Sequence, residues 1–137
     1  MFRLILAFIF TAASAHAQTP LTGDEFETYT KGRTLTYFEG GLAYGIEQYL
    51  PDRQVRWAFD GSDCQDGKWW ETEKGLICFI YENAPDSTQC WSTQCWNFFK
   101  SRKGLRAVFM SEPEGRALYE ARASRQPMLC LGPKVGV

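Results

Sequence analysis

Cysteine and histidine decide which chemistry is open to this chain. The sequence has five cysteines, and its only histidine is His16, close to the N-terminus. Attack by a serine, threonine or cysteine needs an adjacent base, and without another histidine only lysine or a carboxylate could serve. No such nucleophile–base motif follows His16. The sequence therefore gives no support for an enzyme, and it predicts no cofactor.

Carboxylates form two further groups with spacing that could do chemistry. The aspartates of segment 60–66 recur at every third position, whereas a calcium-binding EF-hand places its ligands at every second position and closes with a distant glutamate. We interpret this segment as a solvated turn. Glu71, Glu73 and Glu82 could supply an acid and a base for glycoside cleavage if their separation were suitable. Glutamates at strand ends usually face solvent, so a hydrolase is only an alternative interpretation.

Aromatic side chains make up 15% of the sequence, and many fall on expected strands. In a small barrel such side chains either fill the interior or leave one end open for a small apolar ligand. Trp69 and Trp70 are adjacent in the sequence, so they point to opposite faces of a strand and one of them should lie outside the core. The candidate ligand-binding residues are Trp57, Trp69, Trp70, Tyr81 and Trp96.

The first 17 residues have the three parts of a secretory signal peptide. Arg3 precedes an apolar run, and the small residues Ala15 and Ala17 predict cleavage before Gln18. The apolar run is shorter than the roughly 20 residues that a membrane-spanning helix needs. We therefore expect one periplasmic or secreted domain, residues 18–137, that does not span a membrane after cleavage. The formal net charge of −1 gives little attraction to nucleic acid.

All five cysteines follow this signal, so they should reach an oxidising compartment, where thiols normally pair. The simplest expectation is two disulfides and one remaining thiol. Structural zinc uses close cysteine pairs such as C-x2-C, but the nearest pair here, Cys90 and Cys95, is separated by four residues. No metal site is predicted.

The elements that would position these residues are one helix and a series of short strands. Thr22 and Glu25 form a capping-box pattern that predicts a helix over 23–31. Alternation and turn residues predict strands over 34–38, 42–49, 54–60, 68–73, 76–81, 89–91, 96–99 and 105–110. Residues 116–123 fit a strand or a short helix equally well. Short strands with tight turns favour an antiparallel sandwich or up-and-down barrel, because a parallel sheet needs longer crossovers.

The expected strand pairing suggests where disulfides could form. If strand 76–81 pairs with the run that follows Pro85, Cys78 lies opposite or diagonal to Cys90, within reach of a cross-strand bond. A second bond could join Cys130 to Cys64 or to Cys95. The sequence alone leaves this connectivity open.

Three short motifs resemble those of a known group of proteins. Gly67-Lys68-Trp69, the segment 77–81 and a Cys-Trp pair, at Cys90 or at Cys95, resemble the G-x-W, L-C-F-x-Y and C-W core of small lipocalin-like (calycin-like) periplasmic proteins. The resemblance covers about residues 33–122. It implies an antiparallel barrel and a disulfide between the Phe-x-Tyr strand and the Cys-Trp strand, and it carries no established activity. Because the Cys-Trp pair occurs twice here, the resemblance leaves the partner of Cys78 open.

Together these features predict an all-β fold, in which one short N-terminal helix precedes an antiparallel meander that forms a small closed or half-open barrel. The expected function is an exported binding or interaction module whose partner is a small apolar ligand or an envelope protein. One alternative is a calycin-type protease inhibitor that inserts residues 18–23 into a protease cleft. The other is a histidine-free hydrolase that uses Glu71 or Glu73.

Overall fold

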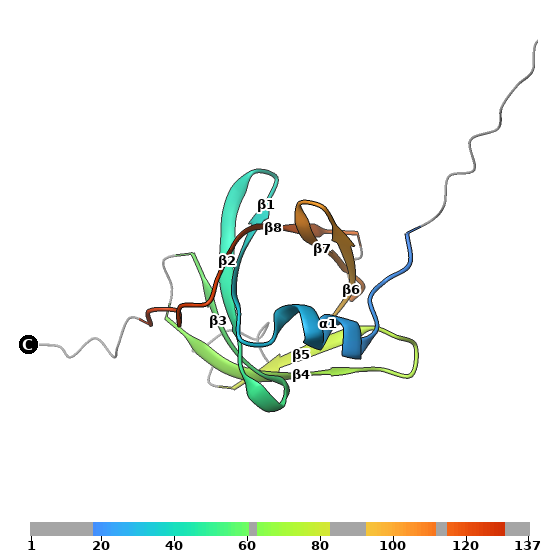
Figure 1. Ribbon diagram of the computed structural model, residues 1–137, viewed down its shortest axis with the longest axis horizontal. Helices are drawn as coiled ribbons and strands as arrows, with labels where there is room; N and C mark the ends of the chain where they lie inside the picture. The colour runs from blue at the N-terminus through green and yellow to red at the C-terminus, as the bar shows by residue number, and fades with distance from the viewer. Residues whose placement is uncertain (1–17, 61–62, 83–92, 112–114, 131–137) are drawn as a thin grey trace, which may run out of the picture.

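The computed structural model describes residues 18–60, 63–82, 93–111 and 115–130. Within these residues the chain forms a closed antiparallel barrel with one short helix (Figure 1). The elements are α1 (Gly23–Thr30), β1 (Thr34–Glu39), β2 (Leu42–Tyr49), the 3-10 turn η1 (Pro51–Arg53), β3 (Gln54–Phe59), β4 (Gln65–Glu71), β5 (Ile77–Tyr81), β6 (Gln94–Ser101), β7 (Gly104–Phe109) and β8 (Ala117–Ser124). The expected all-β barrel is confirmed.

Each strand pairs with the next along the chain, and β8 returns to pair with β1, which closes the barrel. Closure satisfies the backbone groups that an open sheet would leave unpaired at its edges. It also decides the conformation of the segment for which the sequence allowed a strand or a helix. This segment is the strand β8, because hydrogen bonds to β1 on one side and to β7 on the other hold it extended.

Local sequence signals explain the helix and the first hairpin. The Thr22 Oγ1 accepts a hydrogen bond from the Glu25 amide at 3.2 Å, and the Glu25 carboxylate accepts one from the Thr22 amide at 2.9 Å, which completes the capping box. Between β1 and β2 the chain reverses through Gly40 and Gly41, both at positive φ, where glycine carries little steric penalty.

Helix α1 lies across one end of the barrel (Figure 1). Its Phe26 is fully buried, and its ring lies 4.3 Å from that of Phe98 and 5.0 Å from that of Trp69, centroid to centroid. The segment before the helix is fixed to β6, since the Leu21 amide donates to the Phe98 carbonyl at 2.7 Å. The helix therefore plugs this end of the barrel with an aromatic side chain.

The disulfide of β5 joins Cys78 to Cys95, which lie opposite each other in the β5–β6 register with Cα atoms 4.0 Å apart. The expected pairing of Cys78 with Cys90 is therefore wrong. The physical reason is that β5 pairs directly with β6, so Cys95 occupies the position opposite Cys78. Cys90 and the expected strand 89–91 lie outside the described residues.

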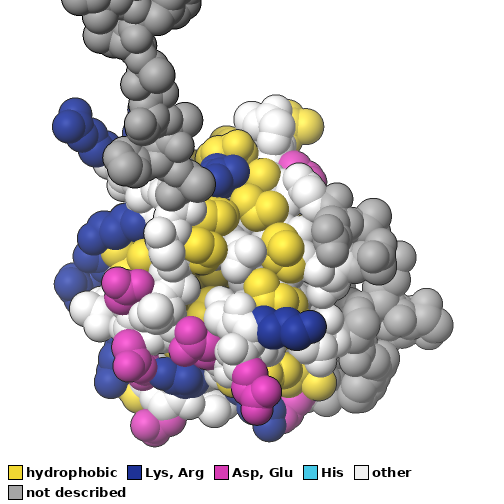
Figure 2. Space-filling view, turned by 90° about the vertical axis from the view of Figure 1, so that its right-hand side faces the viewer, with side chains coloured by type: hydrophobic (Ala, Val, Ile, Leu, Met, Phe, Trp, Pro, Cys, Tyr) yellow, Lys and Arg dark blue, Asp and Glu magenta, His cyan; other side chains and the backbone are white. Residues whose placement is uncertain are grey.

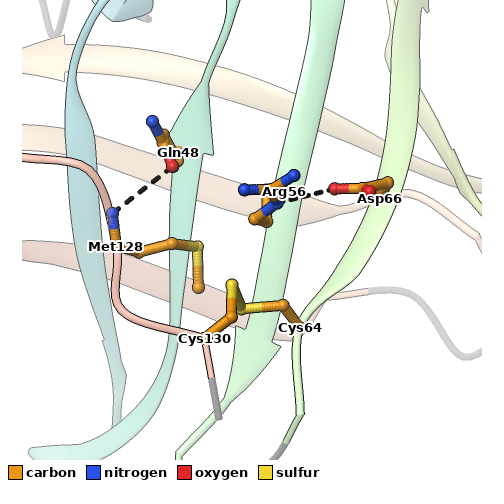
Figure 3. The surroundings of a disulfide bond; sticks show 6 residues. All are labelled: Gln48, Arg56, Cys64, Asp66, Met128 and Cys130. Atoms are coloured by element: carbon orange, nitrogen blue, oxygen red, sulfur yellow. Dashed lines mark hydrogen bonds and ion pairs between the residues drawn. A yellow bond between two sulfur atoms is a disulfide. The ribbon is translucent and has the colours of Figure 1, made fainter. Parts of the chain in front are cut away.

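The second disulfide, Cys64–Cys130, is one of the two pairings that the sequence left open for Cys130. It fixes the C-terminal segment against the outer face of β2 and β3 (Figure 3). On the way the Met128 amide donates to the Gln48 side chain at 3.3 Å. This segment thus gives one wall of the barrel an additional outer layer.

The outer wall also has a hydrophobic patch, on the side where β6 and β7 lie. Figure 2 shows hydrophobic side chains gathered in the middle of this face, with charged side chains around them. Phe99 of β6 is half-buried, and the Arg106 guanidinium lies 4.6 Å from the centre of its ring.

Among the described residues no helix has both the length and the apolar character needed to cross a membrane.

Candidate ligand-binding cavity

A small cavity lies inside the barrel, on the far side of the aromatic layer that packs against Phe26. Its lining residues are Tyr37, Tyr44, Glu47, Tyr49, Trp57, Phe59, Gln65, Phe79, Tyr81, Gln94, Trp96, Phe98, Ala107 and Leu118. The centre of a water-sized sphere can occupy about 40 Å³ of this space. One water molecule needs about 10–15 Å³ by that measure, so the cavity has room for a few small groups.

Strand ends show which end of the barrel the cavity lies toward. Phe59 is the last residue of β3, Gln65 is the first of β4 and Gln94 is the first of β6, so all three lie at the barrel end opposite α1. Phe59 is 37% exposed. Among the described residues, aromatic and amide side chains therefore line this end of the cavity, which we call its mouth, and the aromatic layer around Phe26 closes the other end.

The polar centre of the cavity is Glu47, which projects inward from β2 and is only 4% exposed. The Tyr81 hydroxyl donates to Glu47 Oε1 at 2.7 Å, and the Tyr49 hydroxyl donates to Oε2 at 3.4 Å. The hydroxyl of Tyr49 also shares a 2.9 Å hydrogen bond with that of Tyr37. Two tyrosine hydroxyls therefore orient the carboxyl group, and the third tyrosine, Tyr37, is bonded to one of them.

Burial dominates the protonation of this cluster. It raises the pKa of Glu47 to about 8, while the hydrogen bonds from Tyr81 and Tyr49 act in the opposite direction. Burial also raises the pKa of Tyr37, Tyr49 and Tyr81 well above the usual tyrosine range. At neutral pH the tyrosines keep their hydroxyl protons, and the Glu47 carboxyl is mostly protonated.

No lysine or arginine is among the described residues that line the cavity. At the mouth, Arg116 donates to the hydroxyl of the lining residue Tyr44 at 2.8 Å and is paired with Glu39 at 2.6 Å. Buried charges in proteins are normally paired with an opposite charge. Glu47 has hydrogen-bond donors around it but no positive charge from the lining residues.

The structure places the five candidate aromatic residues in three environments. Trp57, Tyr81 and Trp96 line the cavity. Trp69 instead packs beneath α1, with the Arg53 guanidinium 4.6 Å from its ring centre. Trp70 lies on the outer side of the same strand, as the alternation of a strand requires. Trp69 and Trp70 therefore do not line the cavity with the other three, so the structure does not bring all five predicted ligand contacts together.

Sequence reasoning missed Glu47 because a β-bulge changes the strand alternation around it. Leu42, Tyr44 and Ile46 alternate as an apolar face, which would leave Glu47 on the solvent side. The register between β1 and β2 shifts at Tyr37/Phe38, where Tyr37 lies opposite Gly45 but Phe38 lies opposite Ala43. This bulge reverses the phase, so that Glu47 and Tyr49 face inward.

A glycine makes room for the aromatic wall beside the bulge. A Cβ atom on Gly45 would collide with the Trp57 ring and come within 2.7 Å of the Ala58 carbonyl oxygen. The ring of Trp57 can therefore lie directly against the backbone of β2. Only a residue without a side chain allows this close approach.

The carboxylates that the sequence suggested for catalysis lie elsewhere. Glu71, Glu73 and Glu82 are exposed, and none of them lines the cavity. Asp66 is also exposed and accepts a hydrogen bond from the Arg56 side chain at 2.7 Å. Within the described part of the chain, no group of histidine, cysteine and acidic residues is placed to hold a metal ion.

We compared the chain with protein-family models, with curated proteins and with solved structures, and none of these comparisons returned a match. The resemblance to small lipocalin-like periplasmic proteins therefore rests on its motif residues alone.

Proposed function

We propose that this protein is an exported, lipocalin-like module of the periplasm that binds a small ligand inside its barrel. The observation that carries this proposal is the buried Glu47, held by tyrosine hydroxyls in an aromatic cavity. Ligand sites in proteins are typically apolar pockets with a few fixed polar groups that orient the ligand. This cavity has that composition.

Stability alone does not explain a carboxyl group at this position. Burying an ionisable group without an opposite charge beside it costs free energy, and replacing buried ionic groups by apolar side chains of similar volume is often neutral or stabilising. A ligand that uses the carboxyl group would give a functional reason to keep it. Tyr81 and Tyr49 fix its orientation in advance, which lowers the cost of ordering a binding site.

The cysteines support the proposed compartment. Two disulfides are formed within the described residues, and disulfides persist mainly in oxidising compartments. The signal-like segment that precedes Gln18 points to the same export route.

The two alternative functions receive less support from the contacts. The segment that would enter a protease cleft is bonded to β6, through the Leu21 amide and through the Gln18 side chain, which donates to the Lys100 carbonyl at 2.6 Å. Insertion would have to break these bonds. A hydrolase built on Glu71 or Glu73 would have to work on the exposed surface, away from the cavity.

Native mass spectrometry of the protein purified from the exported fraction tests this proposal. We expect a small molecule that stays bound in the folded protein and is released on denaturation. Ala107 lines the cavity and is 2% exposed, so Ala107→Leu should fill the space and abolish the retained mass. The matched control is Ala121→Leu, at an exposed position of β8. Equal retention by Ala107→Leu, or a wild-type barrel that releases nothing, would count against a cavity ligand.

A further inference from the structure

Glu47 is a buried acid to which the described lining residues give hydrogen bonds but no countercharge. Oε1 of Glu47 accepts from Tyr81 and Oε2 accepts from Tyr49, and neither lysine nor arginine is among the lining residues that the structure describes. A carboxylate oxygen can accept more than one hydrogen bond. Both oxygens therefore keep capacity for a donor that enters from the cavity.

We propose that the cavity binds a small primary amine as its ammonium cation, with the nitrogen donating to Glu47 and an apolar tail directed toward the mouth. This inference rests on the proposed ligand-binding function and names the chemical class of the ligand. The ammonium group would supply the countercharge that the barrel lacks. A hydrogen bond between an ammonium and a carboxylate is also stronger than one between neutral groups.

The aromatic wall favours the same charge. The rings of Tyr44 and Trp57 lie 5.8 Å apart, and those of Trp57 and Tyr81 lie 6.5 Å apart, centroid to centroid. The faces of aromatic rings are electron-rich and attract cations, more strongly where water is excluded. The same rings offer apolar contact to a hydrocarbon tail. Cation and tail therefore both find complementary groups in one cavity.

Charge at the cavity disfavours an anionic ligand. A carboxylate or phosphate would be buried beside Glu47, where like charges repel or one group must bind a proton. Arg116 at the mouth does not reverse this preference, because Glu39 already neutralises it at 2.6 Å. The small volume, about 40 Å³ for the centre of a water-sized sphere, restricts the buried part to the ammonium group and a few carbon atoms.

Binding of the cation should release a proton. Glu47 is mostly protonated in the empty barrel at pH 7, because burial raises its pKa to about 8. An ammonium ion would bind the ionised carboxylate, so about 0.9 proton should leave for each amine bound at pH 7. The titratable groups that face Glu47 or its hydrogen-bond partners are Tyr37, Tyr44, Tyr49 and Tyr81, whose pKa values are all raised from the usual tyrosine value, so they stay protonated in this range.

Isothermal titration calorimetry with 2-phenylethylamine tests the inference. The neutral analogue 2-phenylethanol and the anion 3-phenylpropanoate serve as matched probes of similar size. We expect the amine to bind at least tenfold more tightly than either, and its Kd to weaken about tenfold from pH 7 to pH 6 as Glu47 takes up its proton. Titrations in phosphate and in HEPES, which differ in ionisation enthalpy, should give different heats that report the released proton.

Two variants and one control variant separate the role of the Glu47 charge from that of the fold. Glu47→Gln keeps the size of the side chain but removes the charge, so amine binding should weaken at least tenfold and the buffer dependence should vanish. Glu73→Gln, at an exposed position, is the control and should bind as the wild type does. Tyr81→Phe, which removes the 2.7 Å hydrogen bond, should move the pH dependence to higher pH even if Glu47→Gln does not fold.

Three outcomes would overturn the inference: no binding of the amine, binding of 2-phenylethanol as tight as that of the amine, or amine binding that Glu47→Gln leaves unchanged. None of these refutes the proposed cavity function, which native mass spectrometry tests independently through the retained ligand and the Ala107→Leu variant. If that experiment also finds no cavity ligand, the function and this inference fail together.

Discussion

Replacing Glu47 with glutamine should make the stability of the barrel much less dependent on pH between pH 5 and pH 8. In the folded protein, burial raises the Glu47 pKa from the ordinary 4.5 to about 8. Across this interval the folded chain holds a proton that the unfolded chain has released. The stabilisation that this proton contributes is fully present below pH 4.5. It decreases as the pH rises and is lost above pH 8.

The size of the effect follows from the interval between the two pKa values. Each pH unit in which the folded carboxyl is protonated and the unfolded one is ionised lowers the unfolding free energy by about 1.4 kcal/mol. From pH 5 to pH 8 the wild type should therefore lose about 3 kcal/mol relative to Glu47→Gln. This loss is a sizeable share of the unfolding free energy of a small domain, which is on the order of 5–15 kcal/mol.

Urea unfolding followed by tryptophan fluorescence, with the disulfides intact, measures this difference at several pH values. The series should end near pH 9, where the raised pKa values of Tyr37, Tyr49 and Tyr81 still keep their hydroxyls protonated. Glu73→Gln, at an exposed position, should follow the wild type. If the wild-type and Glu47→Gln stabilities run parallel from pH 5 to pH 8, the Glu47 pKa is not raised by burial, and the proposed amine site loses its acidic partner.

Three further measurements test the packing and the covalent links. Phe26→Ala should cost about 3–5 kcal/mol of unfolding free energy, because it empties the aromatic plug beneath the barrel, and a loss below about 1 kcal/mol would contradict that role. Replacing both cysteines of Cys64–Cys130 with serine should cost about 4 kcal/mol, against about 3 kcal/mol for Cys78–Cys95, since their sequence separations are 66 and 17. Urea melts of the two double variants would refute this reasoning if the order were reversed. The denatured, non-reduced protein should take up at most one alkyl group per chain, because the two disulfides among the described residues use four of the five cysteines, and mass spectrometry would contradict the pairing if it found three or more.

Local sequence signals were sufficient for most of the elements. The helix was expected over 23–31 and spans Gly23–Thr30, because its capping box lies within four consecutive residues. The second strand was expected over 42–49 and spans Leu42–Tyr49, since the glycines of the preceding turn and the β-rich composition are both local. Short strands separated by tight turns also determined that the sheet is antiparallel.

The disulfide partners depended on contacts that local patterns do not encode. The register of β5 against β6 decides which residue lies opposite Cys78. That residue is Cys95. Cys130 reaches Cys64 because the C-terminal segment runs back over β2 and β3, where Met128 bonds to Gln48 (Figure 3). One pairing depends on the register of two neighbouring strands and the other on the path of the C-terminal segment over the sheet.

The sequence by itself determined an antiparallel β domain with a capped N-terminal helix, because caps, turns and alternation act within a few residues of one another. The tertiary structure alone decided that Glu47 faces the interior. One extra residue in β2, opposite the Tyr37/Phe38 step of β1, reverses the alternation and brings an acid that a regular strand would expose to water into the centre of the barrel. Whether a strand bulges depends on its neighbours in the sheet, and that is why the candidate site could not be found in the sequence.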